Sequence, residues 1–372
     1  MRIGIMLQSL HHFGGIGTYT RHIVQHLLNI DKENEYVIIY PSFGKSHTSF
    51  GKYKGFDNAT EVLSESLIPH AYYWDHFVVP GVARKHGIDL IFNPFLSVPL
   101  RGNFKKVFVA HGCEWFIMPE VFWFTARYSG RLIMQAIMKA ADIVISVSQN
   151  VADELVKATK LPKEKFRVIY NAPGEEFRPV KDETILKLAK EKYCLPDDFI
   201  LFVGGIYPTK NFGGLIQAFH RVAHDIPHTL VVAGNTRWKS QRDMRLIHDL
   251  VLEDRVQCIG WISHEDLPSL YTLATCFIIP SFHESCSVAL LEALSCGCPV
   301  IASHAGGNPE VVGDAALLVD PHSVRDIKEA ILKVVATPEL RRELAKKALV
   351  RAENFSWEKC ARETLQIFAD LA

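Results

Sequence analysis

The sequence lacks both an excess of charge of one sign and a long apolar run. Its 372 residues include 41 Lys and Arg and 41 Asp and Glu, so the formal net charge is zero. No global positive field therefore attracts nucleic acid or an anionic membrane, and only a local patch could do so. No uninterrupted apolar stretch approaches the roughly 18 residues of a membrane span. The composition, 48% hydrophobic and 22% charged, excludes a disordered or collagen-like chain and indicates a globular protein of two or three domains.

Patterns that bind metals are also missing. The eight cysteines are dispersed, and no second Cys or His pair lies at zinc-site spacing from Cys296-Gly-Cys298. Neither H-E-x-x-H nor D-x-D occurs. The first residues, Met1–Gln8, become polar too soon for a signal peptide and predict a strand. We therefore expect no metal, reduced cysteines and a cytoplasmic setting, with peripheral contact at the inner face of the membrane left open.

Short β-rich runs alternate with helical patterns along most of the chain. The runs consist mainly of Val, Ile and Leu, which favours strands of parallel sheets covered by helices on both faces. The sequence therefore predicts an α/β protein with doubly wound parallel sheets. The predicted strands are 3–7, 36–40, 90–92, 107–110, 143–147, 166–169, 199–203, 229–233, 256–259, 277–279, 300–302 and 316–319. The predicted helices include 18–28, 130–140, 212–223, 241–252 and 288–295, and the tail from Pro338 to Ala372 is predicted to be helical throughout.

A polar segment rich in turn formers, Asn171–Pro179, separates two such series. We place the domain boundary there, with a first domain over residues 1–172 and a second over 173–354. In open parallel sheets, ligands bind at the carboxyl ends of the strands. The loops that follow the strands are therefore the places where we expect chemistry.

The first of these loops contains Gly14-Gly15-Ile16-Gly17 and precedes a helix. Glycine lets a backbone approach a ligand closely, and a helix N-terminus favours an anion, so one interpretation is a phosphate site. A plain tight turn is the alternative. A dinucleotide-binding loop would need a third glycine and an acidic residue at the end of the second strand, and both are missing. NAD binding is therefore disfavoured.

The matching loop of the second domain runs from Gly204-Gly205 to Lys210-Asn211. Backbone N–H groups and one ammonium group could hold a diphosphate there. The loop is not of the Walker A type, because G-x-x-x-x-G-K-[ST] is absent. The alternative is a loop that carries an exposed lysine and binds nothing.

A third loop carries Glu284, and Glu292 lies about two turns into the predicted helix that follows it. Carboxylates suit the binding of sugar hydroxyls, and both groups could face one crevice. Glu292 is flanked by Leu290, Leu291 and Leu294, which is an unusual setting for a lone glutamate. The alternative for Glu292 is a solvated position on the helix surface.

These residues resemble the signature of the retaining glycosyltransferases of family 4. The resemblance rests on Glu284-x7-Glu292 together with residues 308–321, and it covers nearly the whole chain. Three shorter matches accompany it, namely the Gly14–Gly17 loop, a strand followed by His111, and Phe355-Ser-Trp-Glu at the start of the last helix. The resemblance implies a GT-B fold of two facing Rossmann-like domains, with residues 355–372 returning to the first. A nucleotide-sugar donor would bind mainly to the second domain.

The same resemblance implies roles for single residues. Lys210 would neutralise the donor diphosphate, Glu292 would bind the ribose, and Glu284 would hold the sugar. The expected catalytic residues are His111, Lys210 and Glu284, and the expected donor-binding residues are Gly14, Gly15, Gly204, Gly205, Lys210, Asn211, Ser285, Cys286, Ser287, Val288 and Glu292.

The chain departs from the family pattern in two places. Many relatives carry an arginine as well as the lysine in the second-domain loop, but here Gly205, Ile206 and Thr209 stand at those positions. Many also have glycines after the first glutamate, where this chain has Ser285-Cys286-Ser287. The first departure bears on phosphate affinity, and the second bears on which sugar is bound.

The implied reaction is transfer of a hexose from a nucleotide-sugar, with retention at the anomeric carbon and with neither metal nor other cofactor. Residues 309–320 are similar to a mannosyltransferase-like branch, so GDP-mannose is the favoured donor. UDP-glucose or a UDP-N-acetylhexosamine is the alternative donor, and a nucleotide-sugar-binding protein without transferase activity is the alternative function. The expected acceptor is a glycan or glycolipid. No nucleic-acid partner is expected, and the oligomeric state is left open.

Acceptor recognition is expected in the first domain, where the sequence is less informative. Trp115–Tyr128 holds six aromatic residues within fourteen. We interpret this segment as an acceptor platform or a membrane-contacting amphipathic element, with ordinary core packing as the alternative. His11 and His12, before the first glycine loop, could face the same site or form a surface pair.

Overall fold

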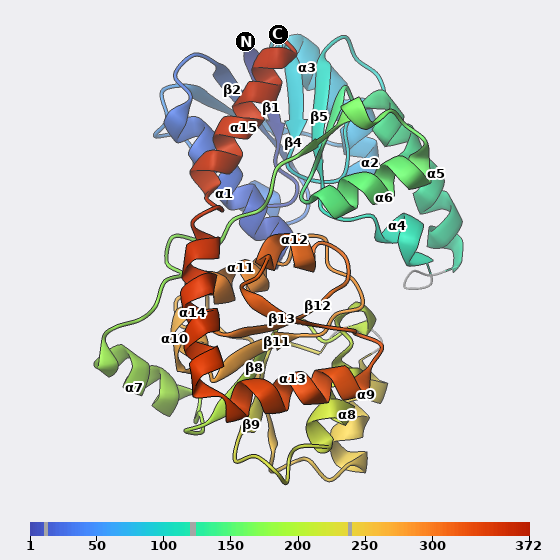
Figure 1. Cartoon of the computed structure of the whole chain (residues 1–372). Helices are drawn as coiled ribbons and strands as arrows, with labels where there is room; N and C mark the ends of the chain where they lie inside the picture. The colour runs from blue at the N-terminus through green and yellow to red at the C-terminus, as the bar shows by residue number, and fades with distance from the viewer. Residues whose placement is uncertain (11–13, 120–123, 237–239) are drawn as a thin grey trace. The chain divides into compact units, whose positions relative to one another are not determined.

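The computed structural model describes residues 1–10, 14–119, 124–236 and 240–372. The chain forms two compact units (Figure 1). Unit 1 comprises Met1–Ala172 and Ser356–Ala372, and unit 2 comprises Pro173–Phe355. The sequence places the change of domain at the same position, between 172 and 173, and the return of the chain one residue earlier, at 355.

Unit 1 is built on a seven-stranded parallel sheet with the order β3-β2-β1-β4-β5-β6-β7. Most of its strands are buried almost throughout because their Val, Ile and Phe side chains lie between helices. The order reverses between β1 and β4, which is the topological switch point of a doubly wound sheet. The strands are β1 Arg2–Met6, β2 Glu35–Pro41, β3 Ala59–Ser64, β4 Leu90–Asn93, β5 Lys105–Ala110, β6 Ile143–Ser146 and β7 Phe166–Val168.

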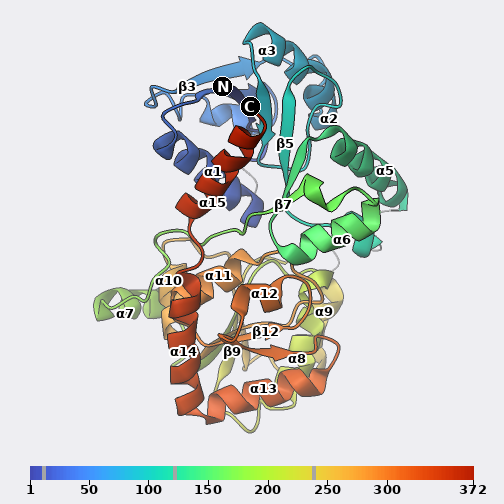
Figure 2. The same ribbon diagram turned by 45° about the horizontal axis from the view of Figure 1, so that its top comes forward.

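The last helix of the chain belongs to unit 1. Helix α15 packs along α1, as Figure 1 and Figure 2 both show. The Trp357 indole of α15 stacks on the His22 imidazole of α1, with 5.0 Å between ring centroids. The helical elements of unit 1 are α1 Gly15–Ile30, η1 Ser46–Ser49, α2 Ala71–Tyr73, the π-helical η2 Trp74–Val78, α3 Val79–Lys85, α4 Glu114–Ile117, α5 Phe124–Ala140, α6 Gln149–Thr159, η4 Lys163–Lys165 and α15 Trp357–Asp370.

Unit 2 contains a six-stranded parallel sheet with the order β10-β9-β8-β11-β12-β13. Its core includes buried side chains of β8, α8 and α13. The strands are β8 Phe199–Val203, β9 Thr229–Ala233, β10 Val256–Gly260, β11 Cys276–Ile279, β12 Val300–Ser303 and β13 Ala316–Val319. The helices are α7 Glu183–Lys192, η5 Pro208–Lys210, α8 Phe212–His220, α9 Gln241–Asp249, α10 Leu267–Leu273, α11 Val288–Ser295, α12 Asn308–Val312, α13 Val324–Ala336 and α14 Pro338–Ala352.

The predicted class, an α/β protein with doubly wound parallel sheets, is confirmed. Among the differences between predicted and observed elements, three have a local cause. Strand β3 was not predicted, because it is a sheet edge whose residues are mostly half-exposed or exposed. Helix α7 was also not predicted, and it begins where the Asp182 carboxylate accepts the Thr184 N–H. The tail is not helical throughout, because α14 ends at Ala352 and Ser356 caps a new helix by accepting the Lys359 N–H. Among the described residues, none of the helices has the length and apolar character to traverse a bilayer.

Candidate active site

The loop after β8 is anchored by Asn211. This residue has a left-handed backbone conformation, with φ of 53°, at the start of α8. Its side-chain amide donates to the Pro280 carbonyl at 3.0 Å and to the Pro321 carbonyl at 2.6 Å. The buried Asn211 side chain thus joins three backbone segments of unit 2. Asn211, one of the predicted donor-binding residues, therefore uses its side chain to hold the loop after β8 in place.

Lys210 and Glu284 form an ion pair inside unit 2. The Lys210 Nζ lies 2.6 Å from the Glu284 Oε1, and the Ser281 hydroxyl donates to the same carboxylate oxygen at 2.6 Å. The two side chains are only 13% and 10% exposed. The backbones of the two loops are also joined, since the Phe282 N–H donates to the Thr209 carbonyl. The structure therefore brings together two of the predicted catalytic residues that are 74 positions apart.

Close backbone approaches around these loops require glycine. A Cβ on Gly234, after β9, would lie 2.0 Å from the Gly204 carbonyl oxygen, and both residues have positive φ. A Cβ on Gly306, after β12, would lie 2.3 Å from the Glu284 carbonyl oxygen, which accepts the Gly307 N–H at 2.7 Å. We did not single out Gly234, Gly306 or Gly307 from the sequence. The available signal was a glycine soon after a strand, the same signal that marks Gly204.

The segment between the two glutamates leads into the N-terminus of α11. Ser285, Cys286 and Ser287 are each less than 9% exposed, and Ser287 is the N-cap residue of α11. No acidic side chain lies in the first turn of this helix, so its N–H groups retain their preference for an anion or a polar oxygen. Val288, the first residue of α11, is half-buried. These four predicted donor-binding residues form one continuous stretch directly after Glu284.

Glu292 is buried, at 4% exposure, on the inner side of α11. The Tyr271 hydroxyl donates to its Oε2 at 3.1 Å. Burial raises the pKa of the Glu292 carboxyl to about 8, the Tyr271 hydrogen bond opposes this shift, and the charge of Glu176 adds to it. The alternative of a solvated surface glutamate is therefore wrong. Whether ionised or protonated, a buried carboxyl group with a single hydroxyl partner retains acceptor capacity for further donors.

Glu292 makes the stability of the protein dependent on pH. Because its pKa lies above the usual 4.5, the folded state binds more protons than the unfolded state between about pH 4.5 and pH 8. Unfolding free energy should therefore fall across this window by up to about 1.4 kcal/mol per pH unit. We expect Glu292→Gln to reduce the loss of stability between pH 5 and pH 9 in urea unfolding. The exposed Glu353→Gln serves as control, and equal pH profiles of Glu292→Gln and wild type would contradict the assignment.

In unit 1, the first glycine loop leads directly into α1. Gly14 is the N-cap residue of α1, with φ of 84°, and both Gly14 and Gly15 are exposed. The first turn of α1 contains no acidic side chain. A helix N-terminus with exposed glycines is thus present at the carboxyl end of β1, as the phosphate interpretation requires. His11 and His12 lie outside the described residues.

His111 follows β5 at the same edge of the unit 1 sheet. Its Nε2 lies 2.8 Å from the Pro94 carbonyl oxygen, which can only accept, so Nε2 carries the proton. Burial lowers the pKa of His111 to about 4, against a smaller opposing effect of this hydrogen bond. The Tyr19 ring packs edge-on against the imidazole, with 4.8 Å between centroids. His111 is therefore neutral near pH 7, and its Nδ1 is a hydrogen-bond acceptor.

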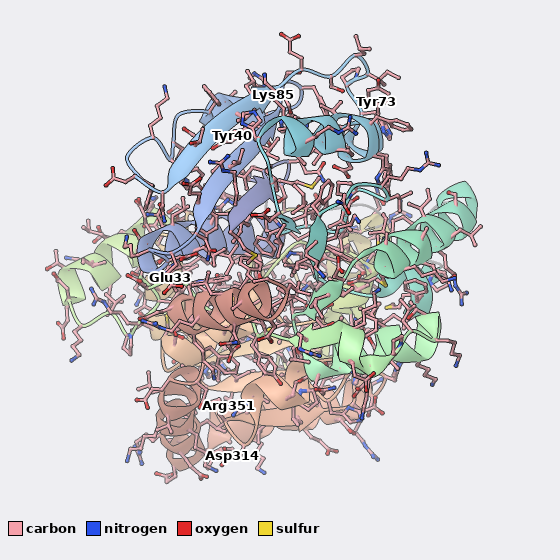
Figure 3. All side chains as sticks on the ribbon, turned by 90° about the horizontal axis from the view of Figure 1, so that it is seen from above. Glu33, Tyr40, Tyr73, Lys85, Asp314 and Arg351 are labelled. Atoms are coloured by element: carbon pink, nitrogen blue, oxygen red, sulfur yellow. The ribbon has the colours of Figure 1, made fainter. Side chains whose placement is uncertain are left out.

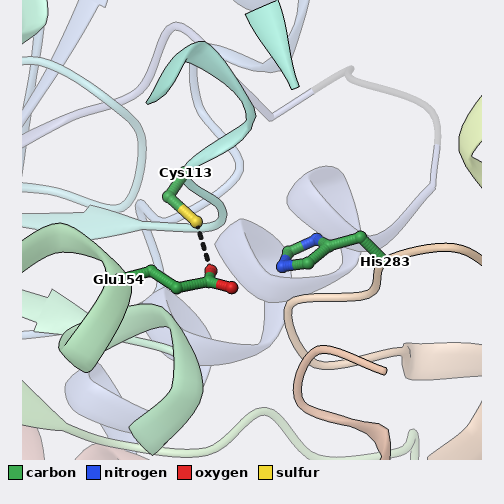
Figure 4. A group of neighbouring side chains, drawn as sticks. All are labelled: Cys113, Glu154 and His283. Atoms are coloured by element: carbon green, nitrogen blue, oxygen red, sulfur yellow. Dashed lines mark hydrogen bonds between the residues drawn. The ribbon is translucent and has the colours of Figure 1, made fainter. Parts of the chain in front are cut away.

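Cys113, two residues after His111, is hydrogen-bonded to Glu154 of α6. Its thiol donates to the Glu154 Oε2 at 2.6 Å, as the dashed line in Figure 4 marks. Burial and this hydrogen bond raise the pKa of the Cys113 thiol well above its usual range. The thiol is therefore protonated and is a poor nucleophile. The third side chain drawn in Figure 4, His283, belongs to unit 2.

The predicted aromatic segment of unit 1 is described only in part. Its side chains from residue 120 to residue 128 lie outside the described set. Of the rest, the Trp115 ring lies within 3 Å of the position that a Cβ on Gly130 would occupy, and the Arg131 guanidinium lies 5.7 Å from the Phe116 ring. Trp115 and Phe116 thus pack against α5 inside unit 1. Both aromatic side chains and Gly130 are half-buried, and Arg131 is exposed, so these contacts lie at the surface of unit 1.

Comparisons with known proteins match both units. The model described as Glycosyltransferase Family 4 matches residues 13–172, and that described as Glycosyl transferases group 1 matches residues 188–351. A Campylobacter jejuni protein, N-acetylgalactosamine-N,N'-diacetylbacillosaminyl-diphospho-undecaprenol 4-alpha-N-acetylgalactosaminyltransferase, is 30% identical over 77% of this chain and 77% of its own length. The chain belongs to glycosyltransferase family 4. The predicted family is thereby confirmed.

This family 4 glycosyltransferase is also similar to a curated mannosyltransferase and to a solved structure. The serotype-specific mannosyltransferase WbdA of Escherichia coli is 29% identical over 90% of this chain, which corresponds to 41% of WbdA. The chain spans less than two thirds of the length of the mannosyltransferases that it matches. The solved structure of Anabaena HepE in complex with UDP-glucose covers 100% of both chains, with a TM-score of 0.78 and 20% identity. This likeness confirms the predicted GT-B fold, whereas the roles of single site residues stay predictions.

Proposed function

We propose that this family 4 glycosyltransferase transfers a hexose from a nucleotide-sugar to a glycan or glycolipid, with retention at the anomeric carbon and without a metal or other cofactor. The observation that carries the proposal is the Lys210–Glu284 pair beside the N-terminus of α11. It offers a cation for a diphosphate and a carboxylate for sugar hydroxyls in one place. Glu292, eight residues along the same segment, supplies a second buried carboxyl group for the ribose.

In the proposed reaction, Lys210 exchanges its partner. The ammonium group moves from the Glu284 carboxylate to the donor diphosphate and neutralises the charge that develops as the glycosidic bond to phosphate breaks. Glu284 then accepts hydrogen bonds from hydroxyls of the sugar. The acceptor oxygen attacks the anomeric carbon from the face that the diphosphate leaves, and the leaving phosphate oxygen takes the acceptor's proton. Attack from that face gives retention without a covalent sugar–enzyme intermediate.

The favoured donor is GDP-mannose. The similarity to WbdA, named a mannosyltransferase, supports this choice over most of the chain. A UDP-sugar is the alternative, supported by HepE, which was solved with UDP-glucose, and by the C. jejuni relative, named an N-acetylgalactosaminyltransferase. The acceptor class is proposed from the same names, since the C. jejuni protein acts on a diphospho-undecaprenol-linked sugar by its name.

Thermal unfolding with GDP, UDP, GDP-mannose, UDP-glucose and NAD, each with and without EDTA, tests the donor and the independence from metal. A ligand present at about 100 times its dissociation constant adds roughly 2.7 kcal/mol to the stability of the folded state. We expect a rise of a few degrees in Tm with guanine nucleotides that EDTA leaves unchanged. A rise in Tm with UDP compounds only would show that the donor is a UDP-sugar, the alternative above. Loss of the Tm shift with EDTA would contradict metal independence. A shift with NAD alone would contradict the proposed function.

A nucleotide-sugar-binding protein without transferase activity is the second candidate. The observation that favours it is the absence of an arginine from the loop that carries Lys210, where Gly205, Ile206 and Thr209 stand. Incubation with the bound nucleotide-sugar and a lipid-linked or oligosaccharide acceptor distinguishes the two. Release of nucleoside diphosphate, together with a product whose anomeric configuration is the same as that of the donor sugar, supports retaining transfer. Donor binding without any turnover supports the second candidate.

A further inference from the structure

The first residue of the last helix, Trp357 of α15, contacts two aromatic rings of α1. Trp357 lies in the sequence match at residues 355–358, for which the proposed function gives no role. Trp357 is 2% exposed, and its indole stacks on the His22 imidazole at 5.0 Å and meets the Tyr19 ring edge-on at 5.5 Å between centroids. Figure 3 shows α15 beside α1 from above, with Glu33 labelled just after the end of α1. The start of α15 is thus fixed to the first turns of α1.

Tyr19 extends this contact to His111. The Tyr19 side chain is fully buried, and its ring packs edge-on against the His111 imidazole with 4.8 Å between centroids. The Tyr19 hydroxyl and the Trp357 indole N–H have no hydrogen-bond partner among the residues that the structure describes. A buried donor without a partner costs stability, so hydrogen bonding does not account for these two side chains. The rings of Trp357, Tyr19 and His111 form a continuous row within unit 1, which we call the ring row.

The ring row limits the orientations of the His111 imidazole. Its Nε2–H donates to the Pro94 carbonyl at 2.8 Å, and a single hydrogen bond still allows the plane of the imidazole to tilt. The edge-on Tyr19 ring opposes this tilt and keeps water from one side of the imidazole. Burial is the larger cause of the lowered His111 pKa, and the Pro94 hydrogen bond opposes it. Loss of the Tyr19 packing should therefore raise the His111 pKa.

We propose that Trp357 and Tyr19 are positioning residues for His111, in which the indole holds the Tyr19 ring and the Tyr19 ring holds the imidazole. The neutral imidazole then presents its Nδ1 acceptor in one orientation. The last helix of the chain thereby contributes to the predicted site of unit 1, although it follows the whole of unit 2 in the sequence. A role of this orientation in sugar transfer rests on the proposed function, whereas the positioning itself does not.

Ordinary packing in the core of unit 1 is the alternative explanation of these contacts. Phe368 provides the comparison, because it lies on the same helix, is fully buried and packs edge-on against Phe92 of β4 at 5.3 Å between centroids. If the rings only fill the core, loss of the Phe368 ring and loss of the Trp357 ring should affect His111 alike. If the ring row positions His111, loss of the Trp357 ring should have the larger effect.

NMR spectra of the full chain with labelled histidine test the positioning without donor or acceptor. The His111 resonance is identified by its absence from His111→Gln, and in wild type it should stay in the neutral form protonated at Nε2 between about pH 5 and pH 8. Trp357→Leu and Tyr19→Leu should each raise the His111 pKa from about 4 toward its usual 6.5, because water reaches the imidazole. Tyr19→Phe keeps the ring and should titrate as wild type, and so should Phe368→Leu.

Kinetics separate positioning from donor binding. The two leucine variants should lower kcat for sugar transfer by about tenfold to a hundredfold, since small misplacements of a reacting group have effects of this size. Their dissociation constants for nucleoside diphosphate should match that of wild type, because the donor is proposed to bind mainly to unit 2. Trp357→Phe keeps an aromatic ring and should recover most of the rate. Tm shows whether each variant is folded, and Trp357→Met replaces a leucine variant that fails to fold, since methionine fills irregular space.

Each result either supports positioning by the ring row or overturns it. A raised His111 pKa in Trp357→Leu and in Tyr19→Leu, with wild-type titration in Phe368→Leu, supports it. An unchanged His111 titration in Trp357→Leu, or an equal change in Phe368→Leu, overturns it. If the His111 pKa rises in the two leucine variants while kcat stays at the wild-type value, the positioning stands and the role of His111 in the proposed function fails, so the two failures are distinguishable.

Discussion

Replacement of Lys210 by alanine is expected to lower kcat for sugar transfer by about a hundredfold to a thousandfold. The reason is that a single electrostatic donor aimed at a developing negative charge lowers the activation barrier by about 2.7–4 kcal/mol. No arginine accompanies Lys210 in its loop, so the variant has no second cation of that loop to replace it. The measurement is steady-state turnover with the donor identified by thermal shift.

Two controls make the Lys210 result specific. Lys187→Ala removes a lysine of the same unit whose side chain is 76% exposed, and it should keep wild-type turnover. Lys210→Arg retains the positive charge and should recover part of the rate, although the guanidinium differs in shape and in hydrogen-bond geometry. Near wild-type turnover by Lys210→Ala would remove this residue from the mechanism. The Tm of the variant must also be measured, because Glu284 loses its counter-ion.

Replacement of Glu284 by glutamine is expected to tighten binding of the free nucleoside diphosphate but to lower kcat/KM for transfer from the nucleotide-sugar. The Glu284 carboxylate lies 2.6 Å from the Lys210 Nζ, so it competes with any diphosphate for this cation. Loss of the negative charge should therefore tighten binding of the free nucleoside diphosphate by about tenfold. Loss of charge-assisted hydrogen bonds to the sugar, each worth about 1.5–3 kcal/mol, should lower kcat/KM of transfer by roughly tenfold to a hundredfold.

The ratio of the two affinities is the decisive readout for Glu284. Titration calorimetry should show the ratio of nucleoside diphosphate affinity to nucleotide-sugar affinity rising by about tenfold to a hundredfold in Glu284→Gln. The lost competition for Lys210 tightens both ligands alike and cancels in this ratio, so the change reports the contacts of Glu284 with the sugar. A general loss of folding would weaken both ligands alike, so it cannot produce this pattern. Glu265→Gln, at an exposed position of unit 2, should change neither affinity. Weaker binding of the free diphosphate by Glu284→Gln would contradict competition for Lys210.

These expectations give the ion pair a role in the order of events. Before donor binding, Lys210 and Glu284 neutralise each other in a mostly buried place, where an isolated charge would be costly. The donor offers both groups new partners at the same time, a diphosphate for the lysine and hydroxyls for the glutamate. The product offers a partner to the lysine only. Glu284 then competes with the nucleoside diphosphate for Lys210, which favours release of this product.

The sequence by itself determined the architecture and the family. Strands such as Phe199–Val203 and helices such as α11 were predicted with the bounds that the structure has, because a buried parallel strand needs a continuous apolar run and a helix stops at glycine. The Glu284-x7-Glu292 spacing identified the family for a similar reason. A loop and the helix directly after it are local in the chain, so their residues keep the same relation in sequence and in space.

Only the tertiary structure decided how the site residues are used. The Lys210–Glu284 pair, the inward-facing Asn211 amide and the Tyr271–Glu292 hydrogen bond join residues that are 74, 69 and 21 positions apart. Likewise, the Pro94 carbonyl, 17 residues away in sequence, determines which nitrogen of His111 carries a proton. Such contacts depend on how loops of different strands meet at one edge of a sheet, and no local pattern carries that information. The types of residue at the site follow from the chain, whereas their partners, protonation and burial follow from the fold.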